Sequence, residues 1–167
     1  MAHKKTHPLD AGDMFPTLPL QLIDGTTLTL PGGLKQPYNV ILVNRGSWCP
    51  FCTQQLTSFQ AGLAKLEAEG IGVLSLSADP LEAARGVAAK AGLTFPLAYG
   101  APVDAVAEAL GAFYDPSPAH TTPYLQSTGY VTGPGGVILS AVYSTGAIGR
   151  LVWQDVLGLV QYIKSHR

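Results

Sequence analysis

Apolar and polar positions alternate along the chain in short runs whose spacing changes from one run to the next. In residues 18–30 (LPLQLIDGTTLTL) every second position is apolar on either side of Asp24-Gly25, a dipeptide typical of a tight hairpin turn. Residues 39–44 (NVILVN) and 71–77 (IGVLSLS) are continuous apolar runs, as in strands buried on both faces of a sheet. The pattern predicts an N-terminal hairpin and two central strands.

Helical spacing follows each of the two continuous runs. From about residue 50 to residue 69, apolar residues recur at three- and four-residue steps, and Gly70 follows as a stop signal. These apolar residues are Leu56, Phe59, Leu63 and Leu66. A second helix has its own signals: Asp79 as the cap, Pro80 at the first helical position and Gly92 at the end.

The rest of the chain continues the alternation of strands and helices. We expect a short strand at 95–98, a helix near 102–110 and a proline-containing surface loop at 114–123. Two further strands join at the glycine-rich turn 133–136, and a last helix carries one apolar face, formed by Val152, Val156, Leu159, Val160 and Ile163. Strands that alternate with helices indicate an α/β protein.

Composition supports one compact unit. The chain has 167 residues, of which 47% are hydrophobic and 13% charged, and this is enough to bury a core without cross-links. We expect a flexible N-terminal arm at residues 1–12 and a single domain at residues 13–167.

Charge and hydropathy argue against two classes of partner, nucleic acids and membranes. The formal net charge is −1 and the sequence has no Lys/Arg run, so nucleic acid is not expected as a ligand. Residues 1–10 are basic but no apolar segment follows them, and no apolar run has the length of a membrane span. The sequence predicts a cytoplasmic protein without a membrane partner.

Both cysteines, Cys49 and Cys52, lie in one CxxC motif at the start of the first long helix. A helix N-terminus lowers a thiol pKa, in CxxC sites to roughly 3.5–7.5, and Cys49 lies where this effect is largest. The spacing lets Cys52 attack a mixed disulfide on Cys49. Pro50 suits the helix start because it has no N–H to satisfy, and Trp48 would form an apolar wall beside the exposed sulfur. The motif predicts a redox-active dithiol.

Two other interpretations of the cysteines are weaker. Structural zinc needs four ligands, and the remaining candidates, His3, His7, His120 and His166, show no ligand spacing. Two inert buried thiols are the second alternative, because free cysteines often fill cores. We therefore favour redox chemistry and expect no cofactor and no bound metal.

The segment VILVNRGSWCPFCTQQL (residues 40–56) resembles the thioredoxin-fold superfamily and, within it, the peroxiredoxin-like (AhpC/TSA-type) proteins. LSLSADP (74–80) and YSTGAIGRL (143–151) are similar to segments of the same group. The resemblance implies a thioredoxin-like fold, with a central mixed sheet flanked by helices. It also implies a thiol-dependent antioxidant oxidoreductase that reduces hydroperoxides or protein disulfides. A thioredoxin-type protein or a low-molecular-weight thiol would restore the dithiol.

The sequence departs from this family at two places. Peroxiredoxins carry Pro-x-x-x-Thr/Ser-x-x-Cys; here either Cys49 or Gly46 takes the Thr/Ser position, depending on which cysteine attacks. Gln126 stands where peroxiredoxins have the arginine that holds peroxide and where thioredoxins have a cis-proline. Pro123, three residues earlier, is the only nearby candidate for a cis bond.

Other residues could supply the missing cation. Arg45, four residues before Cys49, is the best placed, and Arg150 is a second candidate. His120 could donate a proton, although a lone loop histidine is more often simply exposed. Three functions stay open for a monomer or homodimer: a thiol peroxidase, which we rank slightly first, a protein disulfide oxidoreductase, and a non-catalytic CxxC protein that binds a metal or cluster.

Overall fold

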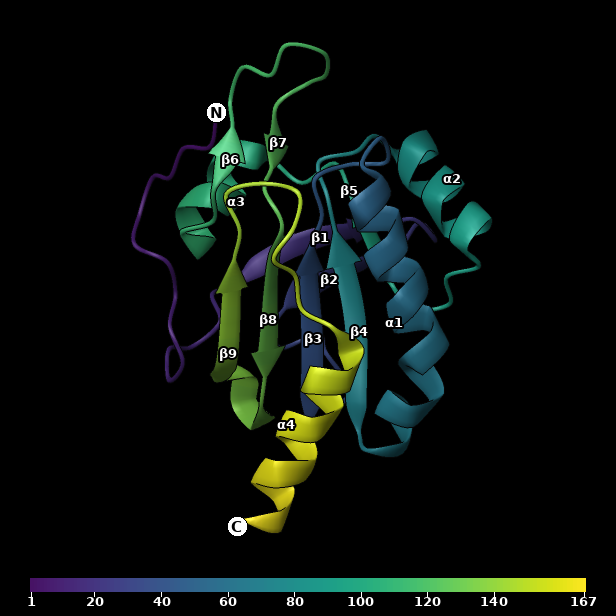
Figure 1. Ribbon diagram of the computed structural model, residues 1–167, viewed down its shortest axis with the longest axis vertical. Helices are drawn as coiled ribbons and strands as arrows, with labels where there is room; N and C mark the ends of the chain where they lie inside the picture. The colour runs from purple at the N-terminus through teal and green to yellow at the C-terminus, as the bar shows by residue number, and fades with distance from the viewer.

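The computed structural model describes all 167 residues and contains a seven-stranded mixed sheet flanked by helices (Figure 1). The strand order is β2-β1-β5-β4-β3-β8-β9, and β6 and β7 form a separate two-stranded ribbon. The elements are β1 Leu18–Leu22, β2 Thr27–Leu30, β3 Tyr38–Val43, α1 Pro50–Ala68, β4 Ile71–Leu76, α2 Leu81–Ala91, β5 Leu97–Tyr99, α3 Val103–Leu110, β6 Tyr114–Asp115, β7 Tyr124–Leu125, β8 Thr128–Thr132, η1 Pro134–Gly136, β9 Ile138–Tyr143 and α4 Trp153–Ser165. The predicted α/β class, mixed sheet and N-terminal hairpin are confirmed.

The two continuous apolar runs form the centre of the sheet. All six residues of β3 are buried, and β3 pairs in parallel with β4 and antiparallel with β8. The N-terminal hairpin pairs β1 with β2 and joins the sheet through β5. The turn at 133–136 joins β8 to β9, as predicted.

Helix α1 begins near the carboxyl ends of β3 and β4 and runs along one face of the sheet (Figure 1). Pro50 occupies its first turn, and its buried face includes the four residues that the spacing marked, Leu56, Phe59, Leu63 and Leu66. The helix ends at Ala68, and Gly70 takes a positive φ of 74° that side chains disfavour. The start of α1, with the CxxC motif, therefore lies close to the end of β3.

Two apolar cores lie on opposite faces of the sheet. One packs α1 and α4 against β3 and β4, with Phe59, Val156 and Val160 fully or almost fully buried. The other packs α3 and the N-terminal hairpin against the same strands, around Leu30 and Ile41. The central strands are therefore fixed from both sides, and so is the end of β3.

Some local expectations were wrong. Asp79 does not cap α2, which begins at Leu81 without a side-chain cap. The Asp79 carboxylate instead accepts a hydrogen bond from the Ser47 backbone N–H at 3.2 Å. The bond before Pro123 is not cis, since the only cis peptide joins Leu30 and Pro31. The predicted loop at 114–123 is bounded by the short β6–β7 ribbon, which no sequence pattern indicated.

The N-terminal segment lies against the domain. The backbone of His3 pairs with Tyr114, and the Leu9 N–H donates to the Tyr143 hydroxyl at 2.8 Å. The division into an arm (1–12) and a domain (13–167) stays a prediction. None of the helices combines the length and apolar character needed to cross a membrane.

Helix α1 packs against α4 at Gly62, where a Cβ atom would overlap the Trp153 ring. We expect Gly62→Ala to lower the free energy of unfolding by about 1–3 kcal/mol, because overpacking outweighs the better helix propensity of alanine. Gly158→Ala in α4 is the matched control. Nothing lies within 4 Å of its added methyl group, so it should stabilise by up to about 1 kcal/mol. Denaturant unfolding measures both, and equal stabilisation would contradict this packing.

Candidate active site

The dithiol lies at the junction of β3 and α1. Cys49 is the last residue before the helix, with extended φ and ψ of −90° and 111°, and its carbonyl accepts the Thr53 N–H at 3.3 Å. Pro50 follows at the first helical position, as predicted. Cys49 and Cys52 are both free, with no disulfide between them.

Both cysteines are buried, which differs from the exposed sulfur that the sequence suggested. Cys49 is 0% exposed and Cys52 is 2% exposed. Trp48 does stand beside the site, but its ring packs edge-on against Tyr124 at 4.8 Å between centroids. A substrate therefore has to reach the sulfurs through the side chains that cover them.

Arg45 contacts the dithiol from the end of β3. Its Nη1 lies 3.6 Å from the Cys49 sulfur, its Nε donates to Gln126 Oε1 at 3.0 Å and its Nη2 donates to the Tyr124 hydroxyl at 3.2 Å. The guanidinium also lies 5.0 Å and 5.1 Å from the ring centroids of Trp48 and Tyr124. These contacts fix the cation beside the sulfur.

Arg150 contacts the dithiol from the connection between β9 and α4, which passes over the upper ends of β8 and β3 (Figure 1). Its Nη2 lies 3.0 Å from the Cys52 sulfur and 3.7 Å from the Cys49 sulfur. Its Nε donates to the Ala147 carbonyl at 2.6 Å, and its Nη1 donates to Gln55 Oε1 at 2.8 Å. One guanidinium thus bridges both sulfurs.

Gln55 and Tyr124 are site residues that the sequence analysis missed. The Gln55 Oε1 accepts a hydrogen bond from Arg150, and the Gln55 Nε2 donates one to the Leu151 carbonyl at 2.9 Å. These two bonds connect α1 to the segment before α4. It stands three residues after Cys52, and this helical spacing could have indicated it. No sequence signal pointed to Tyr124, because its contact depends on how the β6–β7 ribbon folds.

The pKa values of the two thiols are shifted in opposite directions. Burial opposes ionisation of Cys49, but hydrogen bonds from Cys52 and from Arg45, with the charge of Arg150, hold the pKa of its thiol below the ordinary value. Burial raises the pKa of the Cys52 thiol, and the neighbouring Cys49 sulfur raises it further, against the opposing charge of Arg150. The pair therefore favours a Cys49 thiolate that accepts a hydrogen bond from the Cys52 thiol.

Neither arginine pairs with a carboxylate, since the salt bridges of the structure involve other groups. The Cys49 thiolate is thus the nearest anion to both guanidiniums, and negative charge that develops on an oxygen close to this sulfur would also be stabilised. His120 is exposed in the loop between β6 and β7 and makes no hydrogen bond to either cysteine. No group of three or more His, Cys, Asp or Glu side chains is placed to hold a metal ion.

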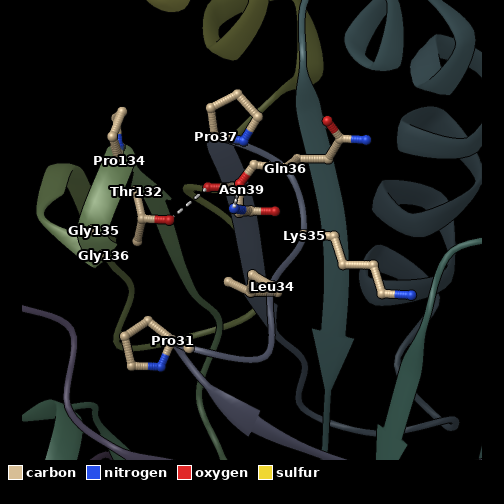
Figure 2. Close-up of a pocket in the computed structure, with 12 residues that line it drawn as sticks. Pro31, Leu34, Lys35, Gln36, Pro37, Asn39, Thr132, Pro134, Gly135 and Gly136 are labelled. Atoms are coloured by element: carbon tan, nitrogen blue, oxygen red, sulfur yellow. Dashed lines mark hydrogen bonds between the residues drawn. The ribbon is translucent and has the colours of Figure 1, made fainter.

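A separate cavity of about 440 Å³ lies at the other end of the sheet, between residues 31–39 and 132–136 (Figure 2). Prolines and glycines form most of its wall, and the Thr132 hydroxyl donates to the Asn39 carbonyl at 3.4 Å. Figure 2 shows the Lys35 side chain directed away from the cavity. Since no cysteine lines this cavity, we place the candidate active site at the dithiol.

Comparisons with known proteins give one family match and several similar folds. Residues 11–140 match the AhpC/TSA family. A peroxiredoxin-like protein from Aquifex aeolicus is 16% identical with a TM-score of 0.79, over 97% of this chain and 92% of that chain. Peroxidoxin BcpB from Mycobacterium tuberculosis is 17% identical with a TM-score of 0.76, over 93% and 98%. A PrxQ mutant from Xylella fastidiosa is 22% identical with a TM-score of 0.72, over 97% and 99%. No curated protein is similar enough in sequence to match.

The contact between Arg150 and the sulfurs predicts a shift in cysteine ionisation. Arg150→Gln should raise the apparent pKa of the dithiol, because it removes the cation that both sulfurs face. An ultraviolet titration of thiolate absorbance measures this value. Arg85→Gln is the matched control, since Arg85 contacts Ile23 and Glu82 away from the site. An unchanged pKa in Arg150→Gln would contradict the assigned contact.

Proposed function

We propose that the chain, which belongs to the AhpC/TSA family, reduces hydroperoxides by a cycle in which Cys49 and Cys52 alternate between dithiol and disulfide. Members of this family are thiol-dependent oxidoreductases. The observation that carries the proposal is the approach of two guanidiniums, those of Arg45 and Arg150, to one buried pair of sulfurs. Such a site combines a thiolate nucleophile with fixed cations for a departing oxygen anion.

The first step is attack of the Cys49 thiolate on the terminal oxygen of the hydroperoxide. The S–O bond forms as the O–O bond breaks, the sulfur is oxidised to a sulfenic acid, and the leaving oxygen departs as an anion. Arg45 and Arg150 stabilise the charge on that oxygen. The Cys52 thiol is the nearest proton donor, and its proton converts the leaving group into an alcohol or water.

The second step uses the thiolate that is left on Cys52. Its sulfur attacks the sulfur of the Cys49 sulfenic acid, the S–S bond forms, and hydroxide leaves and takes a proton from solvent. The overall reaction consumes two thiols and one hydroperoxide, and produces a disulfide, an alcohol and water. Two residues of spacing on the first helical turn keep Cys52 within reach of Cys49.

A reductant closes the cycle by thiol–disulfide exchange. We assign this role to a thioredoxin-type protein or a low-molecular-weight thiol, in a reducing compartment such as the cytoplasm. The assignment applies equally to a monomer and to a homodimer, because all residues of the proposed cycle come from one chain.

Burial of the sulfurs argues against the alternative, reduction of protein disulfides. A thiol that attacks a protein disulfide must reach a sulfur held in a folded chain, and this requires exposure. Cys49 is fully covered here, whereas a small hydroperoxide needs only a narrow path. The third possibility, a CxxC protein that binds a metal or cluster, would need ligands from a second chain, since no group of three or more such side chains lies together within this one.

If Cys49 attacks the peroxide and Cys52 forms the disulfide, serine variants of the two cysteines should react differently with hydrogen peroxide. Stopped-flow mixing of the pre-reduced protein with hydrogen peroxide, followed by Trp48 fluorescence, should show rapid oxidation that Cys49→Ser abolishes. Cys52→Ser should retain oxidation but stop at the sulfenic acid, which mass spectrometry identifies. Oxidation of the wild type no faster than an ordinary free thiol would contradict the peroxidase. Retention in Cys49→Ser with loss in Cys52→Ser would reverse the two roles.

Removal of an arginine cation should slow the reaction with hydrogen peroxide even though both cysteines remain. Arg45→Gln keeps a hydrogen-bond donor but removes the cation, and it should lower the second-order rate with hydrogen peroxide by about 10²–10³-fold. The same stopped-flow assay measures this rate. Arg85→Gln should leave it unchanged, and an Arg45→Gln rate equal to wild type would exclude Arg45 from the chemistry.

A further inference from the structure

The two arginines at the dithiol have no anionic partner in this chain other than a cysteine sulfur. Arg150 Nη2 lies 3.0 Å from the Cys52 sulfur and 3.7 Å from the Cys49 sulfur. Arg45 Nη1 lies 3.6 Å from the Cys49 sulfur. The other hydrogen bonds of both guanidiniums go to amide, carbonyl and hydroxyl oxygens, which carry no charge.

The charge balance of the site therefore depends on the oxidation state of the cysteines. In the dithiol form, one thiolate faces the two guanidiniums. In the disulfide form neither sulfur is charged, and the same two cations lie side by side with no anion between them. A nearby cation stabilises a thiolate but gives no comparable stabilisation to a disulfide, so the arginines favour the dithiol form.

Neither guanidinium depends on the sulfurs for its position. Arg45 donates to Gln126 Oε1 at 3.0 Å and to the Tyr124 hydroxyl at 3.2 Å. Arg150 donates to Gln55 Oε1 at 2.8 Å. Oxidation of the cysteines breaks none of these bonds, so both cations stay beside the disulfide once it has formed.

Burial enlarges the difference between the two forms. Cys49 is 0% exposed and Cys52 is 2% exposed, so little water is present at the sulfurs to screen the cations. The same coverage keeps a sulfur that is held in another folded chain away from the disulfide. The site therefore favours a small, negatively charged group as the one that attacks it.

We propose that Arg45 and Arg150 make the Cys49–Cys52 disulfide easy to reduce, and that its reductant is a low-molecular-weight thiol that attacks as a thiolate. The inference rests on the proposed dithiol–disulfide cycle and names the class of reductant for the same site. The two cations attract the incoming thiolate, and they also stabilise the protein thiolate that the reduction regenerates.

Two molecules of the small thiol complete the reduction. The first, as a thiolate, attacks the Cys49 sulfur, and the bond to Cys52 breaks as the new S–S bond forms. Cys52 leaves as a thiolate and takes a proton from solvent. The second thiolate attacks the sulfur of the bound small thiol, so Cys49 leaves as a thiolate beside its cations and a small disulfide is released. Two small thiols are oxidised and one protein disulfide is reduced.

The first experiment measures the equilibrium between dithiol and disulfide in mixtures of reduced and oxidised glutathione at neutral pH. Alkylation of free thiols followed by mass spectrometry separates the two forms. Arg45→Gln and Arg150→Gln should each raise the equilibrium constant for disulfide formation by about tenfold, because each loses a hydrogen bond from a cation to a thiolate. Equal constants in the wild type and in both variants would overturn the inference.

Two further variants separate charge from structure. Arg150→Lys keeps the cation and should recover most of the tenfold difference, whereas a constant equal to that of Arg150→Gln would overturn the inference. Arg85→Gln is the matched control, since Arg85 contacts Ile23 and Glu82 away from the site, and it should leave the constant unchanged.

The second experiment tests the class of reductant. The oxidised protein is mixed with 3-mercaptopropionate, which carries a carboxylate, or with cysteamine, which carries an ammonium group, at equal thiolate concentrations. We expect re-reduction about tenfold faster with 3-mercaptopropionate, and a smaller preference in Arg150→Gln. Equal rates, or re-reduction only by a thioredoxin-type protein, would overturn the inference. Neither experiment contains a peroxide, so slow oxidation of the dithiol by hydrogen peroxide would separately refute the proposed function.

Discussion

The site depends on one electrostatic arrangement: two guanidiniums contact a pair of sulfurs and have no carboxylate partners of their own. This arrangement depends in turn on the sheet. β3 ends at Val43, two residues before Arg45, α1 begins within the CxxC motif, and the connection after β9 brings Arg150 back to the same edge of the sheet. The buried central strands hold these three segments in register, so the packing of the cores fixes the distances at the sulfurs.

Much of this arrangement could be predicted from the sequence where the signals were local. Periodicity gave α1 and its buried face, and the position of the CxxC motif at the helix start followed from it. Arg45 was the favoured cation because only three residues separate it from Cys49. The contact of Arg150 with Cys52 joins positions 98 residues apart, and no local pattern determines a contact of that kind. Burial of Cys49 likewise depends on side chains from several elements.

Gln126 shows how a departure from a family pattern can be accommodated. The sequence places this glutamine where an arginine is expected, and the structure directs its Oε1 to Arg45 at 3.0 Å. The cation near the sulfur therefore comes from the end of β3, and the glutamine orients it. Burial then gives the CxxC motif a different character from that of an exposed dithiol, because Cys49 is fully covered.

The central claim is that the protein environment makes Cys49 a reactive thiolate towards hydroperoxides. The most direct measurement is the second-order rate of the pre-reduced wild-type protein with hydrogen peroxide as a function of pH. Because the pKa of Cys49 is lowered, the rate should reach its plateau at a pH below the ordinary cysteine pKa and fall only under more acidic conditions. A rate that rises through the ordinary cysteine pKa, at the level of a free thiol, would contradict the account.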